Sequence, residues 1–114
     1  MAQSLISIKK RSTFVNVKEK GRYIRSFSFN IQMLKNIGLN NNIEVGFTAT
    51  KKLGNAVKRN KAKRIMRELA KKVIIKYGKT NYYYVLIAKN SLLTKPFKEL
   101  EIELEKVIRW ILIY

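Results

Sequence analysis

The segment from Lys51 to Lys76 carries a dense set of side chains that can bind phosphate. It contains eleven lysines or arginines and a single acid, Glu68, within a chain of 114 residues whose formal net charge is +18. The guanidinium group of arginine is a planar fork of donors that matches two phosphate oxygens, and the lysine ammonium adds a compact charge. The segment is therefore suited to binding a polyanion.

These charges fall on one side of the segment if residues 55–77 form a helix. At about 100° per residue, the apolar side chains gather on one arc and the basic ones on the opposite arc. The apolar arc consists of Ile65, Met66, Leu69, Val73 and Tyr77, and the basic arc of Asn60, Lys63, Arg64, Arg67 and Lys71. A face that is merely solvated usually mixes charge signs, because like charges one turn apart repel. The segregation predicts a helix that packs through one face and binds nucleic acid through the other.

The run from Val45 to Arg64 resembles the signature of the bacterial ribonuclease P protein component. A strand ends in Lys51-Lys52 and is followed by Gly-Asn-Ala-Val, then Arg-Asn, Lys-Arg and Arg67-Glu68. Chain length, charge and the order of segments also match, so the resemblance spans nearly the whole chain. Lys61 departs from the arginine usual in the family, which keeps the charge but loses bidentate geometry.

The resemblance implies an accessory subunit of a ribonucleoprotein endoribonuclease. In that family the RNA subunit hydrolyses the phosphodiester, and the protein binds both the catalytic RNA and the 5′ leader of precursor tRNA, which assists removal of the leader to give the mature tRNA 5′ end. The expected partners are thus the ribonuclease P RNA and precursor tRNA, without DNA or a membrane, and the expected location is cytoplasmic. Mg²⁺ is expected in the holoenzyme, with no cofactor bound by the protein alone.

The resemblance also assigns residues to two RNA-binding surfaces. The expected surface for the catalytic RNA consists of Lys51, Lys52, Asn55, Arg59, Asn60, Lys61, Lys63, Arg64 and Arg67. The expected leader-binding cleft consists of Phe14, Lys18, Gln32 and Lys89. From the residues alone, Phe14 is better read as a core anchor; by resemblance it is a cleft aromatic that stacks on a base. The family often has aromatic residues at the positions of Lys18 and Gln32, which predicts weaker stacking here.

The residue types argue against a catalytic site in the protein itself. There is no histidine, no cysteine and no aspartate. Histidine pairs for acid–base cleavage and thiolate metal sites are therefore excluded. Four glutamates between residues 99 and 105 lie on one expected helix, where we expect an exposed acidic face. No catalytic and no metal-binding residue is predicted.

The remaining pattern predicts an α+β fold for one RNA-binding domain of residues 1–114. A helix at 9–20 ends at Gly21, and strands are expected at 25–34, 43–50 and 82–88. The first of these strands alternates, with Phe27, Phe29, Ile31 and Met33 expected in the core. Asn55 is expected to cap the basic helix, and Thr94-Lys95-Pro96 to open the last one. The three tyrosines at 82–84 are expected to pack with their hydroxyls bonded at the rim rather than to stack on bases.

The family resemblance refines this architecture to an α-β-β-β-α-β-α sandwich with a mixed four-stranded sheet. It also implies a left-handed βαβ crossover, although right-handed crossovers are far more common. The N-terminus lacks the pattern of a signal peptide, and no uncharged apolar run approaches the roughly 20 residues of a membrane span.

Two other classes of protein share the basic charge. A structural RNA-binding protein of the ribosomal type would bind ribosomal RNA tightly and leave tRNA processing unaffected. A cationic protein of the membrane surface would bind anionic vesicles, although a strand-rich pattern fits that class poorly.

Overall fold

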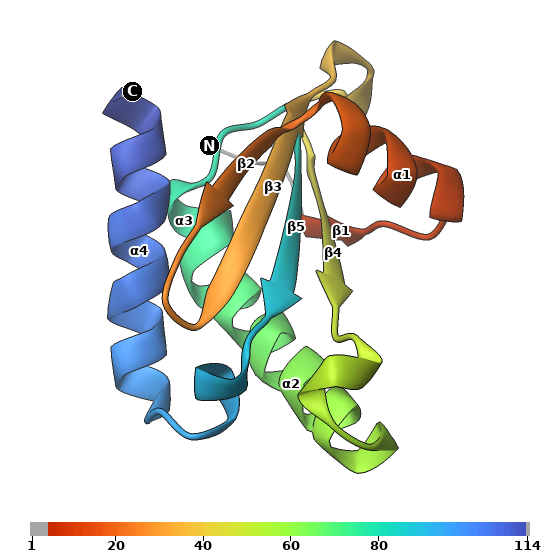
Figure 1. The fold of residues 1–114 in the computed structure, drawn as a ribbon. Coiled ribbons are helices and arrows are strands. Elements are labelled where there is room, and N and C mark those ends of the chain that lie inside the picture. The colour runs from red at the N-terminus through yellow and green to blue at the C-terminus, as the bar shows by residue number, and fades with distance from the viewer. Residues whose placement is uncertain (1–4, 114) are drawn as a thin grey trace.

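Strands β1 to β5 form a single mixed sheet in the computed structural model, which describes residues 5–113 (Figure 1). They are β1 (Leu5–Ser7), β2 (Arg22–Arg25), β3 (Phe29–Lys35), β4 (Ile43–Thr48) and β5 (Tyr82–Ala88), arranged in the order β1-β4-β5-β3-β2. The central strand β5 runs parallel to β4 and antiparallel to β3. The predicted mixed α+β sheet is confirmed, but the predicted number of strands is one too small, because the short strand β1 pairs with β4.

Helices lie on both faces of this sheet (Figure 1). One face carries α1 (Arg11–Lys20), and the other carries α2 (Ala56–Leu69) and α4 (Phe97–Ile113). Short 3₁₀ turns, η1 (Ile37–Leu39), η2 (Lys51–Leu53) and η4 (Asn90–Leu93), lie in the connections. The larger hydrophobic core lies between the sheet and α2 and α4, and a smaller one lies beneath α1. The α1 face is therefore only partly covered.

The basic helix predicted for residues 55–77 is interrupted near its end. Helix α2 stops at Leu69, and a π-helical turn, η3 (Ala70–Ile74), joins it to the short helix α3 (Ile75–Tyr77). Ala70, Val73 and Ile74 are all buried within this wider turn. Of the predicted apolar arc, Met66, Leu69 and Val73 are buried, and Ile65 and Tyr77 are half-buried.

The connection from β4 through α2 to β5 is left-handed, as the family resemblance implies. In Figure 1 both strands point downward, β5 lies to the left of β4, and α2 lies behind them. Parallel strands are joined by right-handed crossovers in almost all other folds. The unusual hand places the basic helix on the face opposite α1, with its first turns emerging beyond the lower end of the sheet.

The strand predicted at 25–34 is part of a hairpin. The chain reverses at residues 26–28, where the backbone N–H of Ser26 donates to the carbonyl of Phe29 at 3.1 Å. Three of the four predicted core residues are buried: Phe29, Ile31 and Met33. The prediction for Phe27 is wrong, because that side chain lies in the turn and is 70% exposed.

Glu103 of α4 connects the β2–β3 hairpin to the helix. The prediction that it lies on an exposed acidic face is therefore wrong for this residue. Its carboxylate accepts hydrogen bonds from the hydroxyl of Ser26 and from the backbone N–H of Ser28, the latter at 2.8 Å. The Nζ atom of Lys95 lies 3.6 Å from the other carboxylate oxygen. Partial burial pushes the pKa of Glu103 upward, but these hydrogen bonds and the lysine charge outweigh it and lower the pKa below its ordinary value.

We expect Glu103→Gln to lower the free energy of unfolding at pH 7 by about 1–3 kcal/mol, because charge-assisted hydrogen bonds are lost. A lowered pKa means that this stabilisation is present above the ordinary glutamate pKa and is lost as pH falls through the lower value. Urea unfolding at pH 7 and pH 3 should show a smaller difference between variant and wild type at the lower pH. Glu19→Gln, an exposed control, should change little at either pH. An equal loss at both pH values would contradict the assignment.

Two of the three tyrosines of β5, Tyr83 and Tyr84, have hydrogen-bonded hydroxyls, as predicted. Tyr84 is buried, and its hydroxyl oxygen accepts a hydrogen bond from the backbone N–H of Lys79 at 2.9 Å. Burial raises the pKa of Tyr84 to about 12. The hydroxyl oxygen of Tyr83 accepts from the side-chain amide of Asn36 at 2.9 Å. Both hydroxyls are therefore bonded at the rim of the sheet.

Candidate nucleic-acid interface

The start of the basic helix is built as predicted. The side chain of Asn55 accepts a hydrogen bond from the backbone N–H of Lys58 at 3.0 Å, so α2 begins at Ala56. Gly54 precedes it with φ of +143°, a backbone conformation that other residues rarely adopt. Asn55 thus has a defined structural role in addition to its predicted place on the RNA-binding surface.

The cations predicted to bind RNA are accessible and uncompensated. Of the nine predicted residues, Arg59 is half-buried and the other eight are exposed. No lysine or arginine of this set forms an ion pair with an acid in the described part of the chain. Lys71, at the end of the predicted basic arc, does pair with Glu68 at 3.5 Å. The surface free to meet phosphate therefore ends near Arg67.

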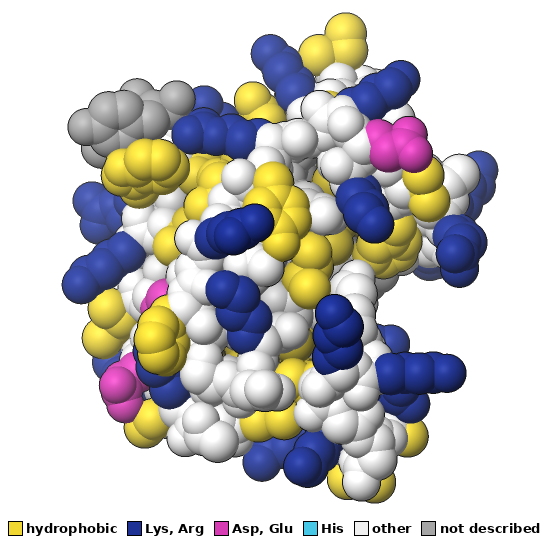
Figure 2. All heavy atoms as spheres, in the orientation of Figure 1, with side chains coloured by type: hydrophobic (Ala, Val, Ile, Leu, Met, Phe, Trp, Pro, Cys, Tyr) yellow, Lys and Arg dark blue, Asp and Glu magenta, His cyan; other side chains and the backbone are white. Residues whose placement is uncertain are grey.

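A cleft of about 650 Å³ lies between α1, the exposed face of the sheet and the start of α2. Its lining residues are Lys9, Arg11, Phe14, Val15, Lys18, Gln32, Phe47, Thr48, Ala49, Thr50, Lys63, Val85 and Ile87. Figure 2 shows it as the notch on the right side of the molecule, with lysine and arginine side chains on both lips. The cleft thus combines an apolar floor with a basic rim.

Three of the four residues predicted for the leader-binding cleft meet in this space. Phe14 and Lys18 come from α1, and Gln32 comes from β3. Lys89 does not line the cleft; its Nζ atom donates to the backbone carbonyl of Ser26 at 2.7 Å and so braces the hairpin. Gln32 is only 6% exposed, which limits it to a floor position.

Phe14 lies directly over the backbone of β4. A Cβ atom added at Gly46 would stand 2.4 Å from Cε1 of Phe14, so the glycine makes room for the ring. The ring also packs against the small core formed by Ile8, Val17 and Val85, and it is half-buried. Phe14 is therefore both a packing residue and an accessible aromatic in the cleft.

We expect Gly46→Ala to displace the Phe14 ring while keeping it in the chain. If the ring stacks on a base, the variant should lose precursor-tRNA affinity by about 1–3 kcal/mol, because a stacked base contributes that amount. Filter binding to precursor and mature tRNA measures the effect, with Gly38→Ala in an exposed turn as the matched control. Precursor affinity unchanged by Gly46→Ala would show that the ring position does not matter for binding.

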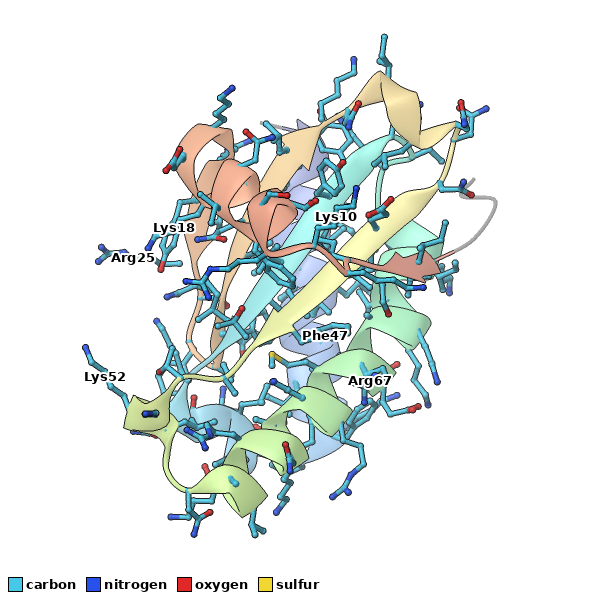
Figure 3. All side chains as sticks on the ribbon, turned by 90° about the vertical axis from the view of Figure 1, so that its right-hand side faces the viewer. Lys10, Lys18, Arg25, Phe47, Lys52 and Arg67 are labelled. Carbon is cyan, nitrogen blue, oxygen red and sulfur yellow. The ribbon has the colours of Figure 1, made fainter. Side chains whose placement is uncertain are left out.

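The basic helix face and the cleft are one continuous surface. Lys63 of the helix lines the cleft, and the guanidinium carbon of Arg67 lies 5.8 Å from the ring centroid of Phe47, another lining residue. Figure 3 shows Phe47 and Arg67 side by side, and shows Lys18 and Lys52 projecting above and below the cleft. A strand of nucleic acid that leaves the helix face can enter the cleft without crossing an acidic region.

Sequence reasoning missed two cations of the cleft, Lys9 and Arg11, and the residues at and just after the end of β4, Thr48 to Thr50. The signal for the cations was present, because both residues lie in the first turn of the predicted first helix. What could not be read from spacing is that this helix end faces Lys63, more than fifty residues later.

Neither a cluster of metal-binding side chains nor a membrane-spanning helix is present among the described residues. Within residues 5–113, no three acidic side chains gather where they could hold a metal ion. None of the helices in that range has the length and apolar character needed to cross a bilayer. A basic helix beside a cationic cleft lined by aromatic rings is typical of proteins that bind nucleic acid.

Comparison with known proteins identifies the family. The sequence model of the ribonuclease P family matches residues 3–111. The ribonuclease P protein component of Ruegeria pomeroyi is 40% identical over 111 residues, covering 95% of this chain and 88% of that protein. The corresponding protein of Symbiobacterium thermophilum is 36% identical over 100 residues, covering 88% and 85%.

Solved structures agree with this match. The ribonuclease P protein of Staphylococcus aureus superposes with a TM-score of 0.77 at 28% identity, over 92% of this chain and 94% of that one. The protein of Thermotoga maritima, at 22% identity and a TM-score of 0.76 over 90% and 94%, shares the fold. The chain belongs to the bacterial ribonuclease P protein family. It is thus a protein component of a ribonucleoprotein ribonuclease that acts in tRNA processing.

Proposed function

We propose that this chain binds the catalytic RNA of ribonuclease P through the basic face of α2 and the 5′ leader of precursor tRNA through the cleft. By holding both, it assists the endonucleolytic removal of the leader. The observation that carries the proposal is the unbroken surface that joins the uncompensated cations of α2 to the cleft at Lys63.

The helix face suits a folded RNA with closely spaced phosphates. Asn60, Arg64 and Arg67 are exposed on successive turns of a rigid element, so their donors can meet phosphates without ordering a loop. Each phosphate neutralised there releases counterions, which makes the binding dependent on salt. Neutralising phosphates near the cleavage site would also lower the concentration of Mg²⁺ that the RNA requires.

The cleft suits a single strand. Its floor is apolar and contains the half-buried ring of Phe14, while Lys9, Arg11 and Lys18 stand on its rim. In a duplex the bases are stacked on one another and cannot reach such a ring, whereas the unpaired bases of a leader can. The rim cations are placed to meet the phosphates of the same strand.

Catalysis is assigned to the RNA subunit. Hydrolysis assisted by two metal ions needs carboxylates that converge from separate elements. In the described part of this chain Glu103 holds the hairpin and Glu105 pairs with Arg109 at 3.4 Å, both on α4 and away from the cleft. We propose that the RNA holds the Mg²⁺ ions and that the protein acts with it in the cytoplasm.

The direct test is cleavage of precursor tRNA by a bacterial ribonuclease P RNA at low Mg²⁺, with and without this protein. The expected result is cleavage at the mature 5′ end only when both are present. Tight binding to ribosomal RNA with no rescue of cleavage would instead favour a structural RNA-binding protein of the ribosomal type.

A further inference from the structure

A second groove, of about 610 Å³, lies where the edge strand β2 meets α4. It is lined by Arg22, Tyr23, Ile24, Arg25, Lys106, Val107 and Trp110. Its lining contains cations and two aromatic rings but no acid. Tyr23 and Trp110 are each 48% exposed. The guanidinium carbon of Arg22 lies 5.5 Å from the centroid of the Trp110 ring.

The strand register connects this groove to the cleft. Tyr23 pairs with Gln32, Gln32 pairs with Val85, and Val85 pairs with Gly46. Paired residues point to the same face of a sheet, so Tyr23 continues the row that forms the cleft floor. The row crosses three strand spacings, or about 14 Å in all. Tyr23 therefore extends the floor of the cleft to the edge of the sheet.

The neighbouring residues of β2 place side chains on both faces of the sheet at that edge. Arg25 lies on the same face as Tyr23, and Figure 3 shows it projecting on the same side of the sheet as Lys18. Arg22 and Ile24 point to the opposite face, toward α4, by the alternation of a strand. Figure 2 shows lysine, arginine and apolar side chains alternating from the notch across this face to α4.

We propose that the path of the leader continues from the cleft across Tyr23 and Arg25 into the β2–α4 groove, where upstream nucleotides stack on Trp110. This inference rests on the proposed function of the cleft. Bases stack on exposed rings whatever their identity, and Arg22, Arg25 and Lys106 supply cations for the phosphates. The groove therefore contributes affinity for longer leaders without strong base preference.

The test measures the affinity of the holoenzyme, reconstituted with a bacterial ribonuclease P RNA, for precursor tRNAs with leaders of about 4 to about 16 nucleotides. For wild type, affinity should continue to rise after the cleft is filled. Trp110→Ala should lower the affinity for the precursor with the longest leader by about fivefold or more, and it should leave the affinity for the precursor with the shortest leader unchanged. Arg25→Ala, at an exposed surface position, should reduce the gain without affecting folding.

Trp110→Phe should keep most of the gain, because it keeps an aromatic ring. Lys98→Ala, an exposed charge change elsewhere on α4, is the control for net charge. Equal losses for short and long leaders, or no loss in Trp110→Ala and Arg25→Ala, would overturn the extended path. If wild type prefers precursor to mature tRNA but gains nothing from longer leaders, only this inference fails. If it shows no preference, the proposed function fails as well.

Discussion

Arg64→Ala is expected to lower the affinity of the protein for ribonuclease P RNA by about tenfold or more, because a charge-assisted contact contributes about 1.5–3 kcal/mol. Arg64 is exposed on the basic face and has no acidic partner among the described residues. Loss of one phosphate contact should also reduce the slope of log affinity against log salt by about one. Titration of labelled RNA at several salt concentrations measures both effects.

The control for this variant is Lys98→Ala, which removes one exposed positive charge from α4. It changes the net charge equally, so it should reproduce only the long-range part of the electrostatic effect. The same salt slope for wild type and Arg64→Ala would show that Arg64 does not meet a phosphate, even if affinity falls.

Phe14→Ala is expected to weaken the binding of precursor tRNA to the holoenzyme by about 1–3 kcal/mol, with mature tRNA much less affected. The ring is half-buried and lines the cleft, where an unpaired leader base can stack on it. The difference between precursor and mature tRNA isolates the leader, because both share the rest of the substrate.

Phe14 also packs on the small core beneath α1, so the loss of stacking must be separated from the loss of packing. Phe14→Leu keeps an apolar side chain over Gly46 but removes the aromatic face, and it should lose nearly the same discrimination. Phe27→Ala removes an exposed ring from the hairpin turn, away from the cleft, and should have no effect on it. Equal losses for both tRNAs in Phe14→Ala would assign the residue to folding.

Features that depend on neighbouring residues could be predicted from the sequence. The Asn55 cap and the burial of Met66 and Leu69 follow from spacings of a few residues, and the structure shows both. The π-helical turn could not be predicted, because it depends on how Ala70 and Ile74 fit the sheet and α4. Phe27 fitted the alternation of a strand, but the position of the turn overrides the pattern.

The candidate site also combines features set by neighbouring residues with features set by residues far apart in the sequence. The basic face was readable from helical spacing, whereas the meeting of Phe14, Lys18 and Gln32 in one cleft was supplied by the family resemblance. Glu103 was expected on an exposed face, but its role depends on Ser26 and Ser28, which are about 75 residues away. The fit of Gly46 beneath Phe14 is likewise visible only when both are placed in space.

Among the described residues, the cations predicted to bind RNA have no acidic partners, and we expect this to shorten the lifetime of the subunit before assembly. Cations held close together without counter-charges repel one another in the folded state, which favours the unfolded chain. RNA that binds the folded state removes this repulsion and stabilises the fold by mass action. Subunits made in excess of their RNA would therefore unfold more often and be degraded sooner. The charge arrangement that serves binding would thus keep the abundance of the protein matched to that of its RNA.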